Sequence, residues 1–443
     1  MKRVLYIVLL AAVLVSTVII NFTNRRLVEN RLRYGISQAD PLINAPPLVV
    51  FTTVALGGFR GIIADMLWLR SARLQYEGKY FELVQLADWI TKLEPRFTDV
   101  WAYHAWNLTY NISVLFSDPA DRWRWVRHGI SLLRDEGLVY NPGEARLIYE
   151  LGWFFQHKIG GTTDDAHMYY KQAWAAEIQA LLGDGRPDYE RLMRDPVRLQ
   201  VMQQQYKLFP ELMQAIERDH GPLDWRLPQA HAIYWATASK NAGRETDVVF
   251  AERMIYQSMA DAFRRGKVFL GADGDRFIPS PHIELLPYVM RAYENAMANP
   301  AERGTAINGY QSFLNEAIIL LYLYNRIPDA QQTFNRLKEI QPDIPEATDL
   351  QEYVFHAYTA RGSDMNMDEA YSAVESAFYQ SIMWAYFGDD ERTRGFDQLA
   401  RMTWSRYMAP RMARPELRER TGLPPLNEIR DAAVRRFAEE QRP

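Results

Sequence analysis

Apolar residues recur at helical spacing over residues 64–95, and this pattern predicts two short amphipathic helices. A turn is expected at residues 77–79, and Pro95 is expected to end the second helix. One face of the first helix carries Leu67, Arg70, Ser71 and Leu74. An apolar stripe of the second carries Leu83, Leu86, Ala87, Ile90 and Leu93. Neither helix can bury its stripe alone, so the pair needs neighbouring helices.

The same helical period returns through most of the chain and predicts an all-α protein. No stretch shows the sustained apolar–polar alternation of a strand, and residues 266–281 are expected to form a loop. Further helices are expected over residues 122–136, 145 onward, 166–182, 195–208, 210–219, 229–240, 246–265, 311–342, 345–361, 367–386, 391–407 and 426–440.

A nearly continuous apolar run extends from Val4 to Phe22. At about 1.5 Å per residue it is long enough to cross the hydrocarbon core of a bilayer. We therefore expect residues 1–23 to form one N-terminal transmembrane helix that anchors the chain. A cleaved signal peptide is the alternative, although no small-residue cleavage site follows the run. We expect the bulk of the chain to be periplasmic or otherwise extracytoplasmic.

Two segments follow the expected anchor. Residues 24–47 are polar and then proline-containing, and they are expected to form a tether. Residues 48–59 are apolar but too short to span a membrane. These residues are expected to cap the hydrophobic end of the helical array, or else to lie on the membrane surface.

Small and aromatic residues recur in units of roughly 34 residues, the length typical of tetratricopeptide repeats. The first unit has Gly78, Tyr80, Ala87 and Pro95 at motif positions, and the later units have Trp101, Ala105, Pro142, Leu151, Gly152, Phe155, Ala330, Phe334, Leu337 and Pro342. On these residues the chain resembles tetratricopeptide-repeat (TPR) proteins. The resemblance implies a right-handed α-solenoid of TPR-like helix-turn-helix pairs, whose concave groove holds peptides or neighbouring proteins. It implies no catalysis.

The resemblance fits some parts of the chain better than others. It predicts N-terminal TPR-like repeats over residues 48–182 and C-terminal TPR-like helical repeats over residues 229–407. Residues 183–228 are polar with several prolines, so they are expected to be an insertion or a degenerate repeat. Residues 408–443 are charged and are expected to form a tail or cap.

Carrying the groove positions of the family over to this chain gives a set of candidate protein-binding residues. It includes Trp68, Gln75, Tyr76, Trp106, Tyr110, Tyr149, Trp153 and His157. Repeat proteins that clamp a peptide carboxylate need several charge-assisted donors, and the groove positions of the first three units lack them. An aromatic, weakly polar groove suits an apolar helix or an extended apolar segment. The alternative is that these aromatic side chains pack between adjacent helices.

Composition and motifs restrict the chemistry. The chain has no cysteine, which excludes disulfides and cysteine-based metal sites, and its formal net charge of −4 gives no basic footprint for nucleic acid. His157 and His167 flank Asp164 and Asp165, but this spacing matches no metal motif, so solvated loop residues are expected there. Residues 271–276 are expected to form a polar turn, and residues 389–391 a solvated helix start. No metal, cofactor or catalytic residue is expected.

These patterns favour a non-enzymatic role. We expect a membrane-anchored scaffold, or an accessory subunit of an envelope complex, that binds other proteins. One alternative is a helical α/α carbohydrate-active enzyme in which Glu150 or Asp99 serves, because such hydrolysis needs two carboxyl groups across a cleft. Another is a purely structural subunit whose aromatic side chains all face inward.

Overall fold

The computed structural model describes residues 60–183, 185–243, 245–270, 277–344, 349–359 and 365–440, together with isolated positions between residues 15 and 30. These residues are almost entirely helical, which confirms the all-α prediction. The expected anchor lies for the most part outside them, as do the expected tether and the apolar residues 48–59. Within the described ranges, no helix is both long and apolar enough to span a bilayer.

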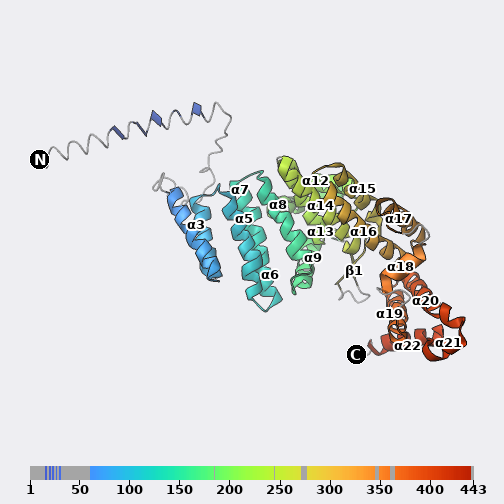
Figure 1. The fold of residues 1–443 in the computed structure, drawn as a ribbon. Coiled ribbons are helices and arrows are strands. Elements are labelled where there is room, and N and C mark those ends of the chain that lie inside the picture. Colours follow the sequence, from blue (N-terminus) through green and yellow to red (C-terminus); the bar gives the residue numbers. More distant parts are fainter. Residues whose placement is uncertain are drawn as a thin grey trace. The chain divides into compact units, whose positions relative to one another are not determined.

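The chain divides into two compact units, Met1–His104 and Ala105–Pro443. The first unit contains α3 (Arg60–Tyr76), α4 (Tyr80–Leu93) and most of α5 (Thr98–Trp106), so the boundary falls inside α5 (Figure 1). The predicted turn between α3 and α4 is confirmed, with Gly78 at a φ of +70° that suits a residue without a Cβ. Helices α3 and α4 pack through two small apolar clusters made of Ala64, Ile90, Leu93 and Val100, and of Leu74, Leu83 and Leu86.

The second unit begins with short helices, several of which continue as π-helical segments. The π-helical segments are η2 (Asn107–Ile112), η4 (Leu132–Gly137), η5 (Phe154–Ile159) and η6 (Met202–Tyr206). The α-helices of this part are α6 (Pro119–Ser131), α7 (Leu138–Tyr140), α8 (Ala145–Trp153), α9 (His167–Leu182), α10 (Tyr189–Met193), α11 (Pro196–Val201) and α12 (Pro210–His220). Short 3₁₀ turns lie at η3 (Ser113–Leu115) and, later, at η7 (Ile283–Leu285).

Longer helices form the rest of the second unit. They are α13 (Pro228–Ala242), α14 (Glu245–Arg265), α15 (Leu286–Ala298), α16 (Arg303–Leu323), α17 (Ile327–Ile340), α18 (Leu350–Thr359), α19 (Met367–Tyr386), α20 (Asp390–Met412), α21 (Pro415–Thr421) and α22 (Leu426–Glu440) (Figure 1). Neighbours in sequence pack as pairs, namely α13 with α14, α16 with α17, and α19 with α20. Each pair also contacts the next helices along the chain, as α14 does with α15.

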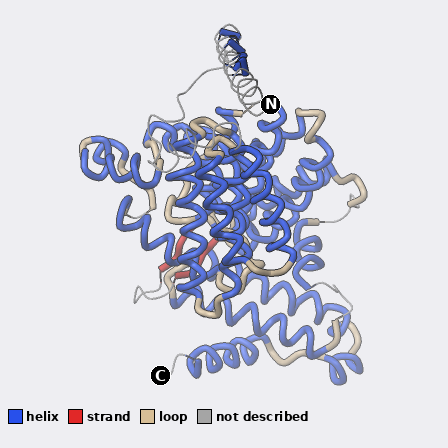
Figure 2. The backbone as a smooth tube through the Cα atoms, turned by 90° about the vertical axis from the view of Figure 1, so that its left-hand side faces the viewer, coloured by secondary structure: helices blue, strands red, loops and turns tan. Residues whose placement is uncertain are grey.

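A two-stranded hairpin interrupts the helices where the sequence predicts a loop. Strand β1 (Lys267–Leu270) pairs antiparallel with β2 (Phe277–Ser280), and Val268 lies opposite Pro279 (Figure 2). The prediction of a loop over residues 266–281 is therefore wrong at both ends. Each strand has only four residues, too few to show the alternation on which a strand prediction depends.

The carboxyl-terminal helices differ from the prediction at their ends. The helix expected at residues 391–407 runs on to Met412 with Pro410 inside it, and the short α21 was not predicted at all. The helix expected from residue 345 begins at Leu350 among the described residues. By contrast, the bounds predicted for α19 and α22 agree with the structure. These two helices are the ones whose apolar spacing is continuous between clear polar ends.

Close helix crossings in the second unit depend on glycine. At Gly152 of α8, an added Cβ would lie 2.7 Å from Sδ of Met254 and 3.3 Å from Cβ of Trp235 on α13. At Gly395 of α20, an added Cβ would lie 2.9 Å from Cα of Leu323 on α16, and closer still to its carbonyl group. A side chain at Gly395 would thus meet backbone, which cannot move aside as a side chain can.

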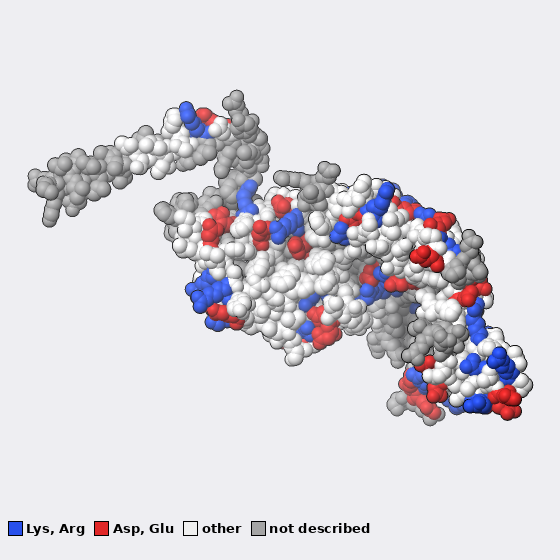
Figure 3. Space-filling view, viewed as in Figure 1, with Lys and Arg blue, Asp and Glu red and all other residues white. Residues whose placement is uncertain are grey.

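Charged side chains of both signs are interspersed on the face of the molecule drawn in Figure 3. Many charged side chains of the described residues form ion pairs one helical turn apart, such as Lys92 with Asp88 on α4 and Arg401 with Asp397 on α20. Such exposed pairs contribute at most about 1 kcal/mol each to stability. Their distribution leaves no continuous basic stripe on the described part of that face.

Candidate functional site

Two π-helical segments form the centre of the site that the sequence singles out. Helix α5 continues into η2, helix α8 continues into η5, and the two π-helical segments contact each other. A π-helical turn holds more residues than an α-helical turn, so it rotates the side chains that follow it, and such turns are frequent at functional sites. Here the rotation brings aromatic residues of two helices together.

Four of the predicted residues form a continuous aromatic ladder, which we define as Trp106, Tyr110, His157 and Trp153. The ring centroids of Trp106 and Tyr110 lie 5.4 Å apart, and those of Tyr110 and His157 lie 5.7 Å apart. The rings of His157 and Trp153 stack at 4.9 Å with an angle of 9° between their planes. All four side chains are partly exposed. The ladder therefore presents aromatic surface to solvent and is not fully buried in a core.

A hydrogen bond joins the two halves of the ladder. The hydroxyl oxygen of Tyr110 lies 3.1 Å from Nδ1 of His157. Burial lowers the pKa of His157, and the charge of Lys158 lowers it further, so the imidazole is neutral at pH 7. Burial also raises the pKa of Tyr110, with a smaller contribution from the charge of Glu150. Because a phenol O–H is a stronger donor than the N–H of a neutral imidazole, we expect the Tyr110 hydroxyl to donate and an unprotonated Nδ1 to accept.

A buried cluster of charged side chains lies against the ladder. The ammonium group of Lys158 lies 2.7 Å from Oδ2 of Asp164 and 3.0 Å from Oγ of Ser113. The same nitrogen lies 5.2 Å from the centroid of the Tyr110 ring, where a cation is attracted to the π face. Arg122 also contacts Asp164, at 3.2 Å. The cluster fixes η5 against η2 and α6.

The structure corrects part of the prediction of solvated loop residues, because Asp164 does lie in the loop before α9 but is buried. The side chain of Asp164 is only 7% exposed and accepts a hydrogen bond from the backbone N–H of Ala166 at 2.9 Å, whereas that of Asp165 is 85% exposed. His167 lies beside Lys171, with 2.9 Å between Nδ1 and Nζ. The carboxylate of Asp164, which a metal ion would need as a ligand, is already bound by Lys158 and Arg122. No group of three or more metal-binding side chains occurs among the described residues.

A polar hollow of about 300 Å³ lies beside the ladder, bounded by Trp153 and His157 and by residues of α13 and α14. Gln156 donates a hydrogen bond to Oγ of Ser258 at 3.1 Å. On the opposite wall Gln229 donates to Asp261 at 2.6 Å, and its Oε1 is buried without a hydrogen-bond partner. The site therefore places aromatic faces next to polar groups.

The predicted residues of the first unit behave differently from one another. Trp68 packs inward, with its ring 5.1 Å from that of Tyr103 and 6.0 Å from that of Phe97. Gln75 accepts a hydrogen bond from the Tyr103 hydroxyl at 2.5 Å. For Trp68 the packing alternative is therefore the one that the contacts support. Tyr76 is 95% exposed at the end of α3.

Tyr149, the last predicted residue, lies on α8 with Trp153 but is not part of the ladder. Its charged neighbours are Glu150 and Arg253. Burial raises the pKa of Tyr149, and Glu150 adds to this effect. The two predicted residues of α8 thus face different surroundings.

An exposed apolar face on α3 was missed by the sequence analysis. We define the α3 apolar face as Ile62, Met66, Leu69 and Tyr76, which are 53%, 66%, 71% and 95% exposed. Their spacing of four, three and seven residues places them on one side of a helix. Tyr76 belongs to the predicted groove set, but Ile62, Met66 and Leu69 were not predicted, and the face expected to pack included Arg70, which is exposed. The signal was present, because these four large side chains repeat at helical spacing.

The residues considered for the enzyme alternative are described each in its own surroundings. Asp99 and Glu150 belong to different units. Burial raises the pKa of Glu150, and Arg146 partly opposes this. The hollow beside the ladder has one carboxylate in its lining, Asp261, which is already bound by Gln229 and Arg265. Acid–base hydrolysis of a glycoside needs a second carboxyl group nearby.

Comparison with known proteins gives no family for this chain. No protein-family model matches the sequence, and no curated protein matches it significantly. The resemblance to TPR proteins therefore stays a prediction from the residues themselves.

Proposed function

We propose that this chain is a membrane-anchored scaffold that holds a partner protein outside the cytoplasm. In this proposal Val4–Phe22 forms the anchor, and the helices form a right-handed α-solenoid of TPR-like pairs. The helical pairs α3–α4, α13–α14 and α16–α17 support the repeat organisation, since each consists of consecutive helices packed on each other. The α3 apolar face of the first unit and the aromatic ladder of the second unit are each proposed as a binding surface for a partner protein.

The α3 apolar face is the observation that carries the proposal. Large exposed apolar side chains are common singly, but a row on one helix indicates an interaction surface. Ile62, Met66 and Leu69 form such a row on α3, and the exposed Arg73 separates them from Tyr76. Burying such a row yields about 25 cal/mol for each Å² of apolar surface removed from water. Leu69 and Tyr76 are the most exposed members, at 71% and 95%, so a partner that covers them gains most there.

The chemistry of the two surfaces indicates the kind of partner. A helical face with side chains four and seven residues apart fits the apolar face of another helix. The ladder adds stacked aromatic rings, and the hollow beside it adds polar groups such as Gln156 and Ser258. An amphipathic helix or an extended apolar segment, with polar groups at its margins, fits each of these surfaces taken separately.

Site-specific photo-crosslinking in the native membrane tests the proposal. A photoreactive phenylalanine analogue placed at Leu69 is expected to form an adduct with one defined protein, identified by mass spectrometry. The same analogue at Gln331, an exposed position of α17, serves as the control and is expected to form no such adduct. Equal adducts at both positions, or adducts with lipid alone at Leu69, would contradict the proposal.

Substitutions then test each surface separately. Met66→Glu places a charge on the α3 apolar face and is expected to abolish the adduct at Leu69, because a charge is costly to bury in an apolar interface. The double variant Trp106→Ala, Trp153→Ala is expected to weaken partner binding at least about tenfold, since interface aromatics often dominate binding energy. Gln331→Glu is the matched control for the added charge. Unchanged binding in the double variant would remove the ladder from the proposal.

A further inference from the structure

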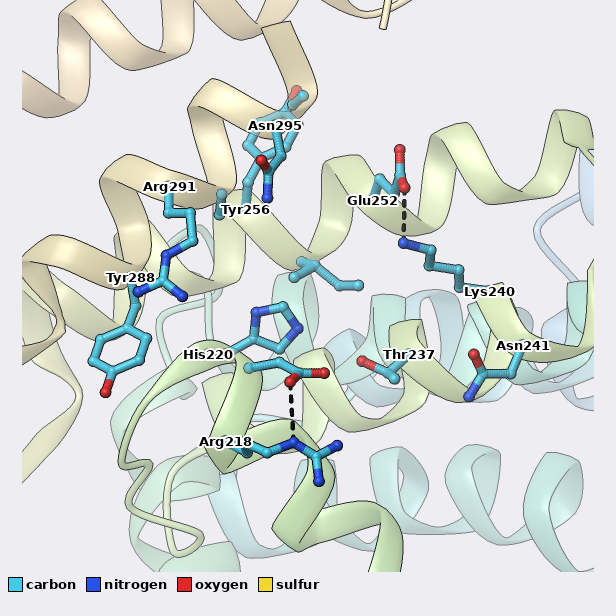
Figure 4. A pocket seen from close by; sticks show the side chains of 14 residues that line it. Arg218, His220, Thr237, Lys240, Asn241, Glu252, Tyr256, Tyr288, Arg291 and Asn295 are labelled. Carbon is cyan, nitrogen blue, oxygen red and sulfur yellow. Dashed lines mark hydrogen bonds and ion pairs between the residues drawn. The ribbon is translucent and has the colours of Figure 1, made fainter. Parts of the chain in front are cut away.

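A second, larger hollow of about 480 Å³ lies among α12, α13, α14 and α15 of the second unit (Figure 4). Its volume is within the range of small-molecule pockets. The end of α12 reaches α15 at Gly221, which has a φ of +85°. A Cβ at Gly221 would lie 2.7 Å from Cδ2 of Tyr288, so only glycine permits this approach. This pocket could not be predicted from the sequence, because its residues come from four separate helices.

Basic side chains from three helices surround the pocket. Arg218 and Lys240 lie in the last turns of α12 and α13, where the helix dipole favours a cation. Arg291 lies in the middle of α15, so the dipole does not account for its position. Its guanidinium lies 5.3 Å from the centroid of the Tyr288 ring and points toward His220 in Figure 4. No carboxylate of the described residues forms an ion pair with Arg291.

Two of the basic residues that line the pocket act on the same side chain, the imidazole of His220. Burial lowers the pKa of His220, Asp219 opposes this, and Lys240 and Arg291 lower the pKa further. Lys240 and Arg291 come from different helices, yet both act on the same imidazole. Both cations therefore lie near His220, Asp219 acts on it in the opposite direction, and burial is the main cause of its lowered pKa.

The charge count of the lining favours one negative charge on the ligand. Arg218, Lys240 and Arg291 are balanced by only two carboxylates, Asp219 and Glu252, which leaves a single positive charge. Asp219 pairs with Arg218 at 3.4 Å and Glu252 pairs with Lys240 at 2.8 Å. Arg291 is the cation left over, and a guanidinium binds a carboxylate through two parallel hydrogen bonds.

We propose that this pocket binds a ligand carrying one carboxylate, with Arg291 as its principal donor. The Lys240 ammonium keeps two further N–H groups beyond the one given to Glu252. Ile255 and Ala296 line the pocket as well and give the ligand a short apolar contact. The ligand is therefore a carboxylate on a small apolar group, either the free end of a peptide or a small organic acid. This site is separate from the α3 apolar face and the ladder, and it does not rest on the proposed function.

Calorimetric titration of the full-length protein in a nonionic detergent tests this assignment. The probes are acetyl-alanyl-leucine, the same dipeptide with an amidated carboxyl terminus, 4-methylpentanoate and inorganic phosphate. We expect at least one of the two carboxylates to bind, and the amide to show no binding. A tighter dipeptide points to a peptide end, and a tighter 4-methylpentanoate points to an organic acid. Equal binding of acid and amide, no binding of either acid, or tighter binding of phosphate would overturn the proposal.

Variants distinguish the pocket from general attraction of anions. Arg291→Gln is expected to weaken carboxylate binding at least tenfold, because it removes a charge-assisted pair of hydrogen bonds. Arg291→Lys keeps the charge but loses the planar fork, so its affinity should lie between those of the wild type and Arg291→Gln. Arg394→Gln makes the same charge change on α20 at an exposed side chain and should change affinity less than twofold. An equal loss in Arg291→Gln and Arg394→Gln would refute a role for the pocket.

Discussion

The ammonium nitrogen of Lys158 lies 2.7 Å from Oδ2 of Asp164, and the two side chains are 3% and 7% exposed. Arg122, whose side chain is 9% exposed, contacts the same carboxylate. One buried carboxylate therefore contacts two buried cations beside the aromatic ladder, and Arg122 also pairs with the exposed Asp165. Burial lowers the pKa of Lys158, and the hydrogen bond and charge of Asp164 oppose that effect. Removing the carboxylate leaves both cations without their buried partner.

Asp164→Asn is accordingly expected to lower the free energy of unfolding by about 3–5 kcal/mol, the usual cost of leaving one member of a buried ion pair alone. Urea unfolding followed by far-UV circular dichroism measures this loss. Asp165→Asn is the matched control, because that side chain is 85% exposed and its pair with Arg122 lies near the surface. The control should lose no more than about 1 kcal/mol. Similar losses for the two variants would show that the cluster does not stabilise the fold.

The pH dependence of stability should follow from the same carboxylate. Burial raises the pKa of Asp164, but hydrogen bonds from Lys158 and the Ala166 N–H, with the charges of Lys158 and Arg122, outweigh it and hold the pKa below its usual range. A depressed pKa in the folded state means that the stabilisation is present above the unfolded pKa of about 3.9 and is lost as the pH falls below it. Urea midpoints measured between pH 6 and pH 3 should therefore fall more steeply in the wild type than in Asp164→Asn. Parallel curves would contradict this assignment.

The hydrogen bond within the ladder gives a third prediction. Tyr110→Phe removes the hydroxyl that lies 3.1 Å from Nδ1 of His157, and should cost about 0.5–1.5 kcal/mol of stability. It should also release His157 from the tautomer that carries its proton on Nε2. The ¹⁵N shifts of the imidazole report this change directly. Tyr149→Phe is the control, because Tyr149 forms no hydrogen bond through its hydroxyl to another described residue. An unchanged tautomer in Tyr110→Phe would mean that the hydroxyl does not donate to Nδ1.

The crossing of α20 over α16 gives a fourth prediction. Gly395→Ala should destabilise the protein by about 1–3 kcal/mol, because the added methyl group meets the backbone of Leu323. Gly304→Ala is the matched control in α16, where an added Cβ has no atom within 4 Å. That change should stabilise slightly, by about 0.4–1 kcal/mol, because it restricts the unfolded chain. Thermal unfolding of both variants should therefore move in opposite directions, and a shift in the same direction would refute the crossing geometry.

Much of the helical organisation could be predicted from the sequence. Apolar stripes, together with glycine or proline residues near helix ends, predict the bounds of α3, α4, α19 and α22 to within a few residues. The hairpin was missed because its strands are too short to show a period. The pairing of Trp106, Tyr110, Trp153 and His157 in one ladder could not be seen, since it depends on π-helical turns that have no reliable sequence signal. The candidate set named these residues, but it did not show how they meet.

The pocket among α12–α15 lies beyond sequence reasoning for a different reason. Arg218, Lys240 and Arg291 look like ordinary surface charges in the sequence, and two of them are the expected cations of helix ends. Only the packing of α12 against α15 shows that the third points into the same space. In the same way, Asp164 is expected from the sequence to be a solvated loop residue, and only the structure shows Lys158 and Arg122 around its carboxylate.

The π-helical segments η2 and η5 make the site unusually sensitive to chain length. In an α-helix each residue turns the chain by about 100°, so the loss of one residue from a π-helical turn restores α-helical geometry and changes the direction of the side chains that remain inside the turn. Deletion of Leu108 or Thr109 would leave α5 helical while carrying Tyr110 away from His157. Substitutions in this surface can therefore weaken the contact between Tyr110 and His157 by degrees, whereas the loss of a single residue from the turn removes that contact.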